Sequence, residues 1–173
     1  MKIEGKNINL RFAEVGDAEF ILRLRTDPSL NRHLSATDAS LPMQQEWLRN
    51  YKVKEQNGQE FYFIITGKDE APLGTVRLYD FQNDSFCWGS WIVLPEAPRT
   101  TAVESALLVY ECAFYKLGFL RSHFDVRKAN ERVLAFHRRF GASEVGEDED
   151  NVFFNFSRED YECIRAQYVR FMR

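Results

Sequence analysis

The spacing of apolar residues in the first half of the chain predicts helices followed by strands. Apolar and polar residues alternate over residues 8–12, which predicts a first strand, whereas residues 18–25 and 40–54 carry apolar side chains at helical spacing. Three strand-like segments come next, at residues 60–66, 73–81 and 85–94, with turn-forming residues between them. Short turns between successive strands favour an antiparallel meander. Residues 85–94 are apolar on both faces, which predicts a central strand covered on both sides.

The second half alternates helices and strands. Apolar spacing predicts a helix from Thr101 to about Gly118, with Thr101 and Glu104 matching a capping box, and a second helix over residues 130–140. Strands are predicted at residues 122–126, 143–146 and 152–156, and a polar helical tail at residues 157–172. The order predicts an α/β fold, an α+β sandwich in which helices flank a mixed, mostly antiparallel central sheet.

Composition narrows the class of protein. A chain of 173 residues, 45% hydrophobic and 28% charged, predicts one folded domain over residues 1–173, with residues 157–173 as its helical tail. A net charge of −3 gives no sign of a nucleic-acid partner. Three widely spaced cysteines without a His/Cys cluster predict no metal and reduced thiols in the cytoplasm. Without an apolar run of membrane length, we expect no membrane partner.

The chemistry concentrates in residues 93–141. Here a central strand ends, a short loop follows, and a helix begins, so unpaired backbone N–H groups and the positive end of a helix dipole face outward. This arrangement favours phosphate binding without a metal. A strand and then an asparagine at the start of a helix that ends in Phe-Gly complete the segment.

On these residues the chain resembles the GNAT superfamily of N-acetyltransferases. The matching residues lie at 93–96, 99, 106–108, 113–114, 117–119, 125–132 and 140–141, with further matches at 10–11, 17–18 and 73–75. The resemblance covers nearly the whole chain, and residues 126–141 are its most specific part. Residues 24–28, Asn31, Leu34 and 46–48 are similar to a branch that contains ribosomal-protein Nα-acetyltransferases and acetyltransferases of nucleotide-linked amino sugars.

The resemblance implies an enzyme that transfers an acetyl group directly from acetyl-CoA to a primary amine, without a metal. In the family, two splayed strands hold the pantetheine arm, and the following loop and helix hold the pyrophosphate. Asn130 is also explained as a helix N-cap, which is compatible with contacting coenzyme A. The cofactor-binding residues that the resemblance implies are Ile92, Val93, Leu94, Arg99, Thr100, Thr101, Ala102, Val103, Asn130 and Phe136.

The pyrophosphate loop departs from the family pattern. Arg99 matches, but Ala102 and Glu104 stand where the family has small residues. If Glu104 folds back onto the Thr101 N–H as a capping box, its carboxylate occupies part of the anion site. This departure keeps open an alternative from another class, a non-catalytic acyl-CoA-binding module.

The acid and the base are less clearly marked. His137 stands where the family commonly has a tyrosine that protonates the leaving thiolate, and a histidine of near-neutral pKa suits that role. The same residue lies in an apolar stripe, which is also typical of a core histidine. For the base, the sequence leaves Asp80, Glu96 and Asp125 open.

Three acceptor classes remain open. Arg25, Trp47 and Trp91 are candidate substrate-binding residues, since the aromatic rings can stack on a sugar or a base, although Trp91 also fits a core position. The acceptor is then a nucleotide-linked amino sugar or another small amine, or alternatively a protein or peptide N-terminus. The acidic run at residues 147–150 favours a polyamine, but is also typical of a solvated hairpin. An exposed face of residues 161–172 is compatible with a homodimer.

Overall fold

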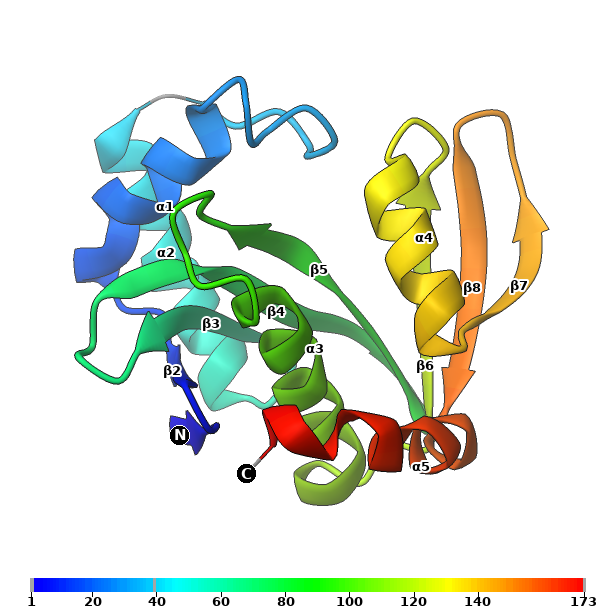
Figure 1. Ribbon diagram of the computed structural model, residues 1–173. Coiled ribbons are helices and arrows are strands. Elements are labelled where there is room, and N and C mark those ends of the chain that lie inside the picture. The colour runs from blue at the N-terminus through cyan, green and yellow to red at the C-terminus, as the bar shows by residue number, and fades with distance from the viewer. Residues whose placement is uncertain (1, 39, 173) are drawn as a thin grey trace.

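The computed structural model describes residues 2–38 and 40–172 and contains one eight-stranded sheet (Figure 1). The strand order is β1-β2-β3-β4-β5-β6-β8-β7, and every neighbouring pair is antiparallel except β5 and β6. This confirms the predicted mixed, mostly antiparallel sheet. The strands are β1 (Lys2–Glu4), β2 (Ile8–Phe12), β3 (Phe61–Gly67), β4 (Pro72–Gln82), β5 (Ser85–Val93), β6 (Arg121–Arg127), β7 (Ser143–Glu147) and β8 (Asn151–Ser157).

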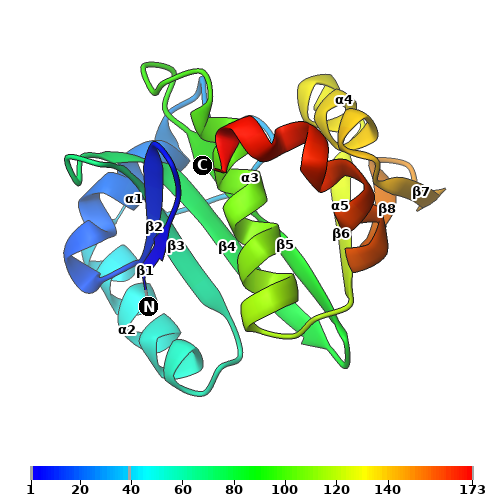
Figure 2. The same cartoon turned by 60° about the horizontal axis from the view of Figure 1, so that its bottom comes forward.

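The helices form two layers, one on each face of the sheet. One layer holds α1 (Ala18–Thr26) and α2 (Leu41–Gln56), with a short 3-10 turn, η1 (Val15–Asp17), before α1. In Figure 2, α3 and the C-terminal helical segment lie across the other face. The remaining helices are α3 (Thr101–Glu111), the π-helical turn η2 (Cys112–Lys116), α4 (Glu131–Phe140), α5 (Arg158–Arg165) and the 3-10 turn η3 (Ala166–Phe171).

Two apolar cores follow from the alternation of side chains along the strands. In β3, Phe63 and Ile65 pack into the larger core under α3, α4 and α5, whereas Tyr62 and Ile64 pack under α1 and α2. The larger core is strongly aromatic, with Tyr110 within 6.5 Å, centroid to centroid, of several other rings. Helices cover both faces of the central strands, and this explains why residues 85–94 are apolar on both faces.

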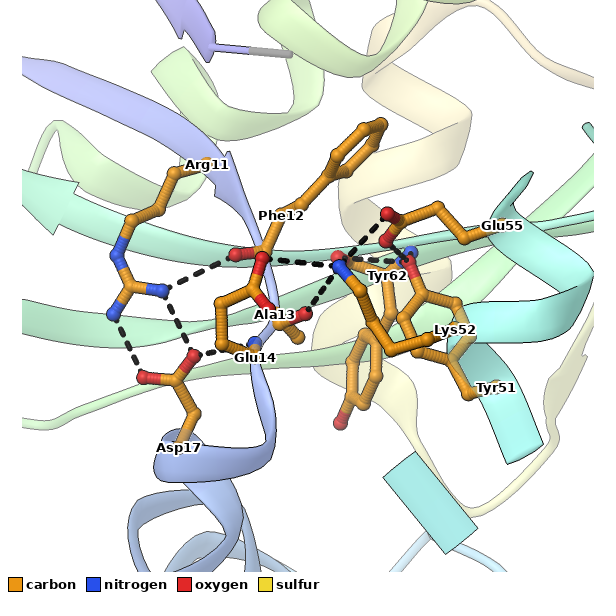
Figure 3. A network of polar contacts seen from close by, with 9 residues as sticks. All are labelled: Arg11, Phe12, Ala13, Glu14, Asp17, Tyr51, Lys52, Glu55 and Tyr62. Atoms are coloured by element: carbon orange, nitrogen blue, oxygen red, sulfur yellow. Dashed lines mark hydrogen bonds and ion pairs between the residues drawn. The ribbon is translucent and has the colours of Figure 1, made fainter. Parts of the chain in front are cut away.

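A polar network fixes α1 and α2 against the sheet (Figure 3). The Arg11 guanidinium forms a two-pronged ion pair with Asp17 at 2.7 and 2.8 Å. Lys52 of α2 donates to the carboxylates of Glu14 and Glu55 at 3.0 and 2.8 Å. These contacts hold the turn before α1 and the second half of α2 close to the end of β2.

The sheet opens between β5 and β6, and this gap positions the site. These two strands pair only through Ser85 with Arg121 and Phe86 with Ser122. By contrast, β6 and β8 pair along the whole of β6. Figure 1 shows β5 and β6 meeting at one end and diverging toward the other, with α4 beside β6.

The predicted elements are present, with three local differences. The strand β1 was not predicted, because three residues are too short for a periodic signal. The predicted helix that begins at Thr101 continues through a π-helical turn before Gly118, whose φ of +82° allows the chain to reverse. The tail is one helix followed by a 3-10 turn.

Candidate active site

A cavity of about 530 Å³ occupies the gap between β5 and β6; we call it the donor cavity. One of its walls is the α1–α2 loop, the second is β5, and the third is β6 with α4. The strongly apolar part lies at α4, where aromatic rings from four elements meet. Its lining residues are Arg25, Ser29, Leu30, His33, Leu34, Ser35, Tyr79, Trp88, Gly89, Ser90, Trp91, Ile92, Val93, Phe124, Asp125, Val126, Arg127, Asn130, Arg132, Val133 and His137.

His137 lies in the aromatic wall of the donor cavity. Its ring centroid is 4.3 Å from Phe124 and 5.5 Å from Trp88, and the side chain is 4% exposed. Burial without a charged partner lowers the pKa of His137 to about 3. Its Nδ1 atom has no hydrogen-bond partner among the described residues. The imidazole is therefore neutral at pH 7.

A second cavity of about 300 Å³ lies beside the first, on the α1–α2 face; we call it the acceptor cavity. Arg25, Ser35 and Ser90 line both cavities, so the two meet at the loop and at β5. The other lining residues come from the α1–α2 loop, α2, β3 and β4, and they are Ala36, Thr37, Asp38, Met43, Gln44, Trp47, Tyr62 and Arg77.

The acceptor cavity is lined by two arginines, Arg25 and Arg77, and by one carboxylate, Asp38. Arg77 is held by the buried carboxylate of Glu60, which also pairs with Lys54 at 3.0 Å. Burial alone would raise the pKa of Glu60, but the hydrogen bonds from Arg77 and Lys54 outweigh it and lower the pKa below the usual range. The Arg77 guanidinium also lies 5.5 Å from the Trp47 ring centroid and 4.8 Å from that of Tyr79. Arg77 is thus fixed in place before any ligand binds.

Arg25 is held from the loop side. Its Nε donates to the Thr37 hydroxyl at 2.6 Å, and an Nη donates to the Ser35 hydroxyl at 3.0 Å. These contacts join the end of α1 to the loop, so the guanidinium stands where the two cavities meet.

A β-bulge marks the point of β5 that both cavities share. Along β4, Thr75 pairs with Ile92 but Arg77 pairs with Gly89, so Ser90 and Trp91 together oppose one residue. Ser90 has a φ of +46°, which is strained for a residue with a side chain, and its carbonyl accepts a hydrogen bond from the Thr75 hydroxyl at 3.0 Å. A bulge leaves backbone groups outside the strand ladder, where they are available to a ligand.

The start of α3 offers unpaired backbone amides. The N-cap is Thr100, without a side-chain hydrogen bond, and the N–H groups of Ala102 and Val103 have no acceptor among the described residues. A chain of hydrogen bonds ties this turn to the donor cavity. The Trp91 indole donates to the Ser105 hydroxyl at 3.0 Å, and that hydroxyl donates to the Ala102 carbonyl at 2.9 Å.

The predicted capping box of Thr101 and Glu104 is wrong. Glu104 is fully buried and points to the β1–β2 turn, where it accepts from the backbone N–H of Asn7 and Ile8 at 2.7 and 3.2 Å. It also accepts from the Asn7 side chain at 2.9 Å. Three hydrogen-bond donors from Asn7 and Ile8 stabilise the Glu104 carboxylate more than the single N–H of Thr101 could. The carboxylate therefore does not occupy the anion site at the start of α3.

Half of the predicted site residues line one of the two cavities. Arg25, Trp91, Ile92, Val93, Asn130 and His137 line the donor cavity, and Trp47 lines the acceptor cavity. Phe136 lies behind Trp91, with ring centroids 5.1 Å apart. Leu94 and the residues from Arg99 to Val103 lie beyond the lining of both cavities, in the loop and at the start of α3.

The three carboxylates left open as the base lie in different places. Asp125 lines the donor cavity. Asp80 accepts from His123 at 3.0 Å, which itself contacts Ser85 at 2.6 Å, and hydrogen bonds from His123 and Gln82 lower the pKa of Asp80. Glu96 lies in the loop after β5. Of the three, Asp125 alone lines either cavity.

Several cavity residues were not found from the sequence. Tyr62, Arg77 and Gln44 lie in elements that were predicted correctly, but the sequence does not tell which face of each element meets the cavity. For Arg77 the sequence offers one weak indication. Glu60 is an acidic residue at the start of an apolar strand, and a buried carboxylate needs a positively charged partner.

Comparison with known proteins decides the family. The sequence profile described as "Acetyltransferase (GNAT) domain" matches residues 7–143. The chain belongs to the GNAT acetyltransferases. Among curated proteins, none matches this GNAT chain significantly.

Solved structures agree with this GNAT fold. The chain is 46% identical to the apo form of FdhC, a nucleotide-linked sugar GNAT, with a TM-score of 0.92 over 100% of this chain and 99% of that one. Spermidine N-acetyltransferase from Vibrio cholerae, solved with CoA and spermine, is 18% identical, with a TM-score of 0.78 over 90% and 98% of the two chains. Ribosomal-protein-S5-alanine acetyltransferase from Vibrio fischeri is 15% identical, with a TM-score of 0.78 over 93% and 98%.

The described part of this GNAT chain shows neither a metal-binding cluster nor a membrane-spanning helix. Within residues 2–38 and 40–172, no group of His, Cys, Asp and Glu side chains is arranged to hold a metal ion. In the same described part, no helix combines the length and the apolar character needed to span a bilayer.

Proposed function

We propose that this enzyme transfers the acetyl group of acetyl-CoA directly to the primary amine of a nucleotide-linked amino sugar. The observation that carries the choice of acceptor is the pair of arginines, Arg25 and Arg77, in the acceptor cavity. Guanidinium groups bind phosphate oxygens in two-pronged hydrogen bonds. They repel a polyamine, which carries positive charges of its own. The 46% identity to a nucleotide-linked sugar GNAT supports the same choice.

For the donor, we propose a path along β5 and into α3. The pantetheine arm lies in the donor cavity beside Ile92, Val93 and Asn130, and the diphosphate binds to the Ala102 and Val103 amides and to Arg99. Backbone amides at the positive end of α3 suit an anion without a metal. The apolar wall of Trp91 and Phe136 suits the thioester end.

The transfer proceeds in one displacement. The neutral amine attacks the thioester carbonyl, a C–N bond forms, the C–S bond breaks, and coenzyme A leaves as a thiolate. Backbone N–H groups at the Ser90 bulge stabilise the negative charge that develops on the oxygen of the thioester carbonyl. The acceptor ammonium first gives up its proton, through water, to Asp125.

The role of His137 as the acid stays a prediction. Its pKa of about 3 means that any such role is carried out by the neutral imidazole. A neutral imidazole donates one hydrogen bond but is a much weaker acid than an imidazolium. We therefore expect His137 to hold the thioester sulfur by a hydrogen bond. The thiolate then takes the second proton, which the nitrogen loses after the C–N bond forms, while the first proton passes from Asp125 to solvent.

The experiment is a panel of acceptors with the purified protein and acetyl-CoA, measuring release of the CoA thiol and the mass of the product. The panel contains nucleotide-linked amino sugars, spermidine, and a peptide with a free N-terminus. We expect thiol release with a nucleotide-linked amino sugar and an acetylated sugar product. Turnover with spermidine or the peptide alone would overturn the proposed acceptor, and thiol release with none of them would overturn the proposed function.

A further inference from the structure

The hydroxyl of Tyr62 is buried in the acceptor cavity without a hydrogen-bond partner among the described residues. Tyr62 is 2% exposed. The other deeply buried tyrosine hydroxyls are paired: Tyr51 with Glu55 at 2.5 Å, Tyr110 with Trp88 at 3.0 Å, and Tyr161 with Glu111 at 2.7 Å. A buried hydroxyl without a partner destabilises a fold, so its presence calls for an explanation.

The rest of Tyr62 is firmly held, so the orientation of its hydroxyl is fixed. Its backbone N–H donates to the Tyr51 hydroxyl at 2.6 Å, and its ring meets those of Tyr51 and Trp47 edge to face. Figure 3 shows the Tyr62 phenol turned away from the hydrogen-bonded network around Tyr51 and Lys52. The phenol thus contributes to the cavity and not to that network.

Tyr62 also lies close to the point where the two cavities meet. Across the sheet, Tyr62 pairs with Arg77, and Arg77 pairs with Gly89, the residue before the Ser90 bulge. The Tyr62 backbone is therefore level with the Ser90 bulge across the sheet, whereas Met43 and Trp47 are exposed at the outer part of the cavity.

Gln44 provides a second polar group in the same cavity. It lines the acceptor cavity from α2 and is 7% exposed. An uncharged hydroxyl and an amide together offer both donors and acceptors. Such a pair suits a sugar hydroxyl better than a phosphate, which the arginines suit.

We propose that the Tyr62 hydroxyl, together with the Gln44 amide of the same cavity, binds a ring hydroxyl of the amino sugar next to the reacting amine and so selects the sugar. This inference rests on the proposed function. The ligand completes the hydrogen bonding that the protein leaves open, and an acceptor without that hydroxyl leaves the buried Tyr62 hydroxyl unpaired. Burial keeps the phenol protonated, because it raises the pKa of Tyr62 more than the nearby side chains of Arg25, Thr75 and Arg77 lower it.

The test compares Tyr62→Phe with the wild type on two acceptors, a nucleotide-linked amino sugar with hydroxyls beside the amine and its deoxy analogue. We expect kcat/KM for the hydroxylated acceptor to fall about 10- to 100-fold in the variant, and kcat/KM for the deoxy analogue to stay within about twofold. The apo variant should melt at the same temperature as the wild type or higher, because the change removes an unsatisfied buried group.

Tyr161→Phe is the matched control, since Tyr161 is fully buried, lines neither of the two cavities and has its hydroxyl paired with Glu111. We expect it to lower the melting temperature and to leave the ratio of the two kcat/KM values unchanged. Equal losses on both acceptors in Tyr62→Phe, or no loss on either, would overturn this inference and leave the proposed function standing. A wild type that acetylates no nucleotide-linked amino sugar would overturn both.

Discussion

The buried ionisable groups near the two cavities differ in their charge: His137 is neutral, whereas Glu60 is ionised. In the donor cavity, His137 lies among aromatic rings without a charged partner, and its pKa falls to about 3. Behind the acceptor cavity, the carboxylate of Glu60 is also buried, but it pairs with Lys54 and with Arg77 of the cavity lining, and its pKa falls below the usual range because the charged form is stabilised. The aromatic wall around His137 excludes charge, whereas the ion pairs around Glu60 hold the charged Arg77 in place.

The difference matches the two substrates that we propose. A thioester and its pantetheine arm are uncharged near the reacting carbon, so an apolar wall binds them without leaving a charge unpaired. A nucleotide diphosphate carries negative charge, so it needs guanidinium groups that are already in position. The two environments meet at Arg25, Ser35 and the Ser90 bulge, which line both cavities.

The largest expected effect comes from removing the fixed charge of the acceptor cavity. Arg77→Gln should lower kcat/KM for a nucleotide-linked amino sugar about 100-fold, because a charge-assisted contact of about 3 kcal/mol is lost. The KM for acetyl-CoA should stay unchanged. Steady-state kinetics checks both values.

Arg25→Gln is the matched control for folding, because Arg25 pairs with hydroxyls and not with a buried carboxylate. It should lower kcat/KM for the same acceptor while preserving the melting temperature. A rise in the KM for acetyl-CoA in either variant would show that the arginines serve the donor.

Next in size is the effect of Glu104 on stability. Glu104→Ala leaves three donors at Asn7 and Ile8 without their acceptor, and should destabilise the fold by about 2–3 kcal/mol. Acetyl-CoA affinity should change little, since the carboxylate points away from the start of α3. Chemical denaturation and calorimetry measure the two quantities, and much tighter acetyl-CoA binding in the variant would contradict the position of Glu104.

The neutrality of His137 predicts a pH dependence of stability. The unfolded histidine takes up a proton below about pH 6.5, whereas the folded one does so only near pH 3, so its contribution is complete above pH 6.5 and is lost as the pH falls toward 3. Between pH 6.5 and pH 5 this amounts to about 2 kcal/mol.

Denaturation curves at both pH values should show a smaller pH difference in His137→Gln than in the wild type. An equal difference would mean that His137 is already protonated in the fold. The same variant tests the predicted acid, because a catalytic imidazolium would leave a limb near its pKa in the wild-type rate profile that the variant lacks.

The smallest expected effect is at the rim of the acceptor cavity. Trp47 is 40% exposed and already contacts Arg77 and Tyr51, so a stacked base gains only part of its surface. Trp47→Ala should raise the KM for the nucleotide-linked acceptor about three- to tenfold, with kcat within twofold. A larger fall in kcat than in affinity would place Trp47 nearer the reacting amine.

The sequence predicted the fold better than it predicted the site. The periodic segments gave the helices and strands, and family motifs located Asn130, His137 and the Ile92–Val93 wall of the donor cavity. Glu104 shows where this reasoning fails: its spacing from Thr101 fits a capping box, but its partners lie 96 and 97 positions away in the chain. Arg77 and Tyr62 were missed for the same reason, because their roles depend on contacts across the sheet.

The acceptor cavity's preference for an anionic acceptor is tested most directly with one pair of compounds. The measurement is kcat/KM of the wild-type protein for a nucleotide-linked amino sugar and for the same amino sugar without its nucleotide. We predict a value at least about 100-fold higher for the nucleotide-linked acceptor, with the difference shrinking as salt is added. Equal values, or a higher value for the free sugar, would contradict the assignment of Arg25 and Arg77 to the nucleotide.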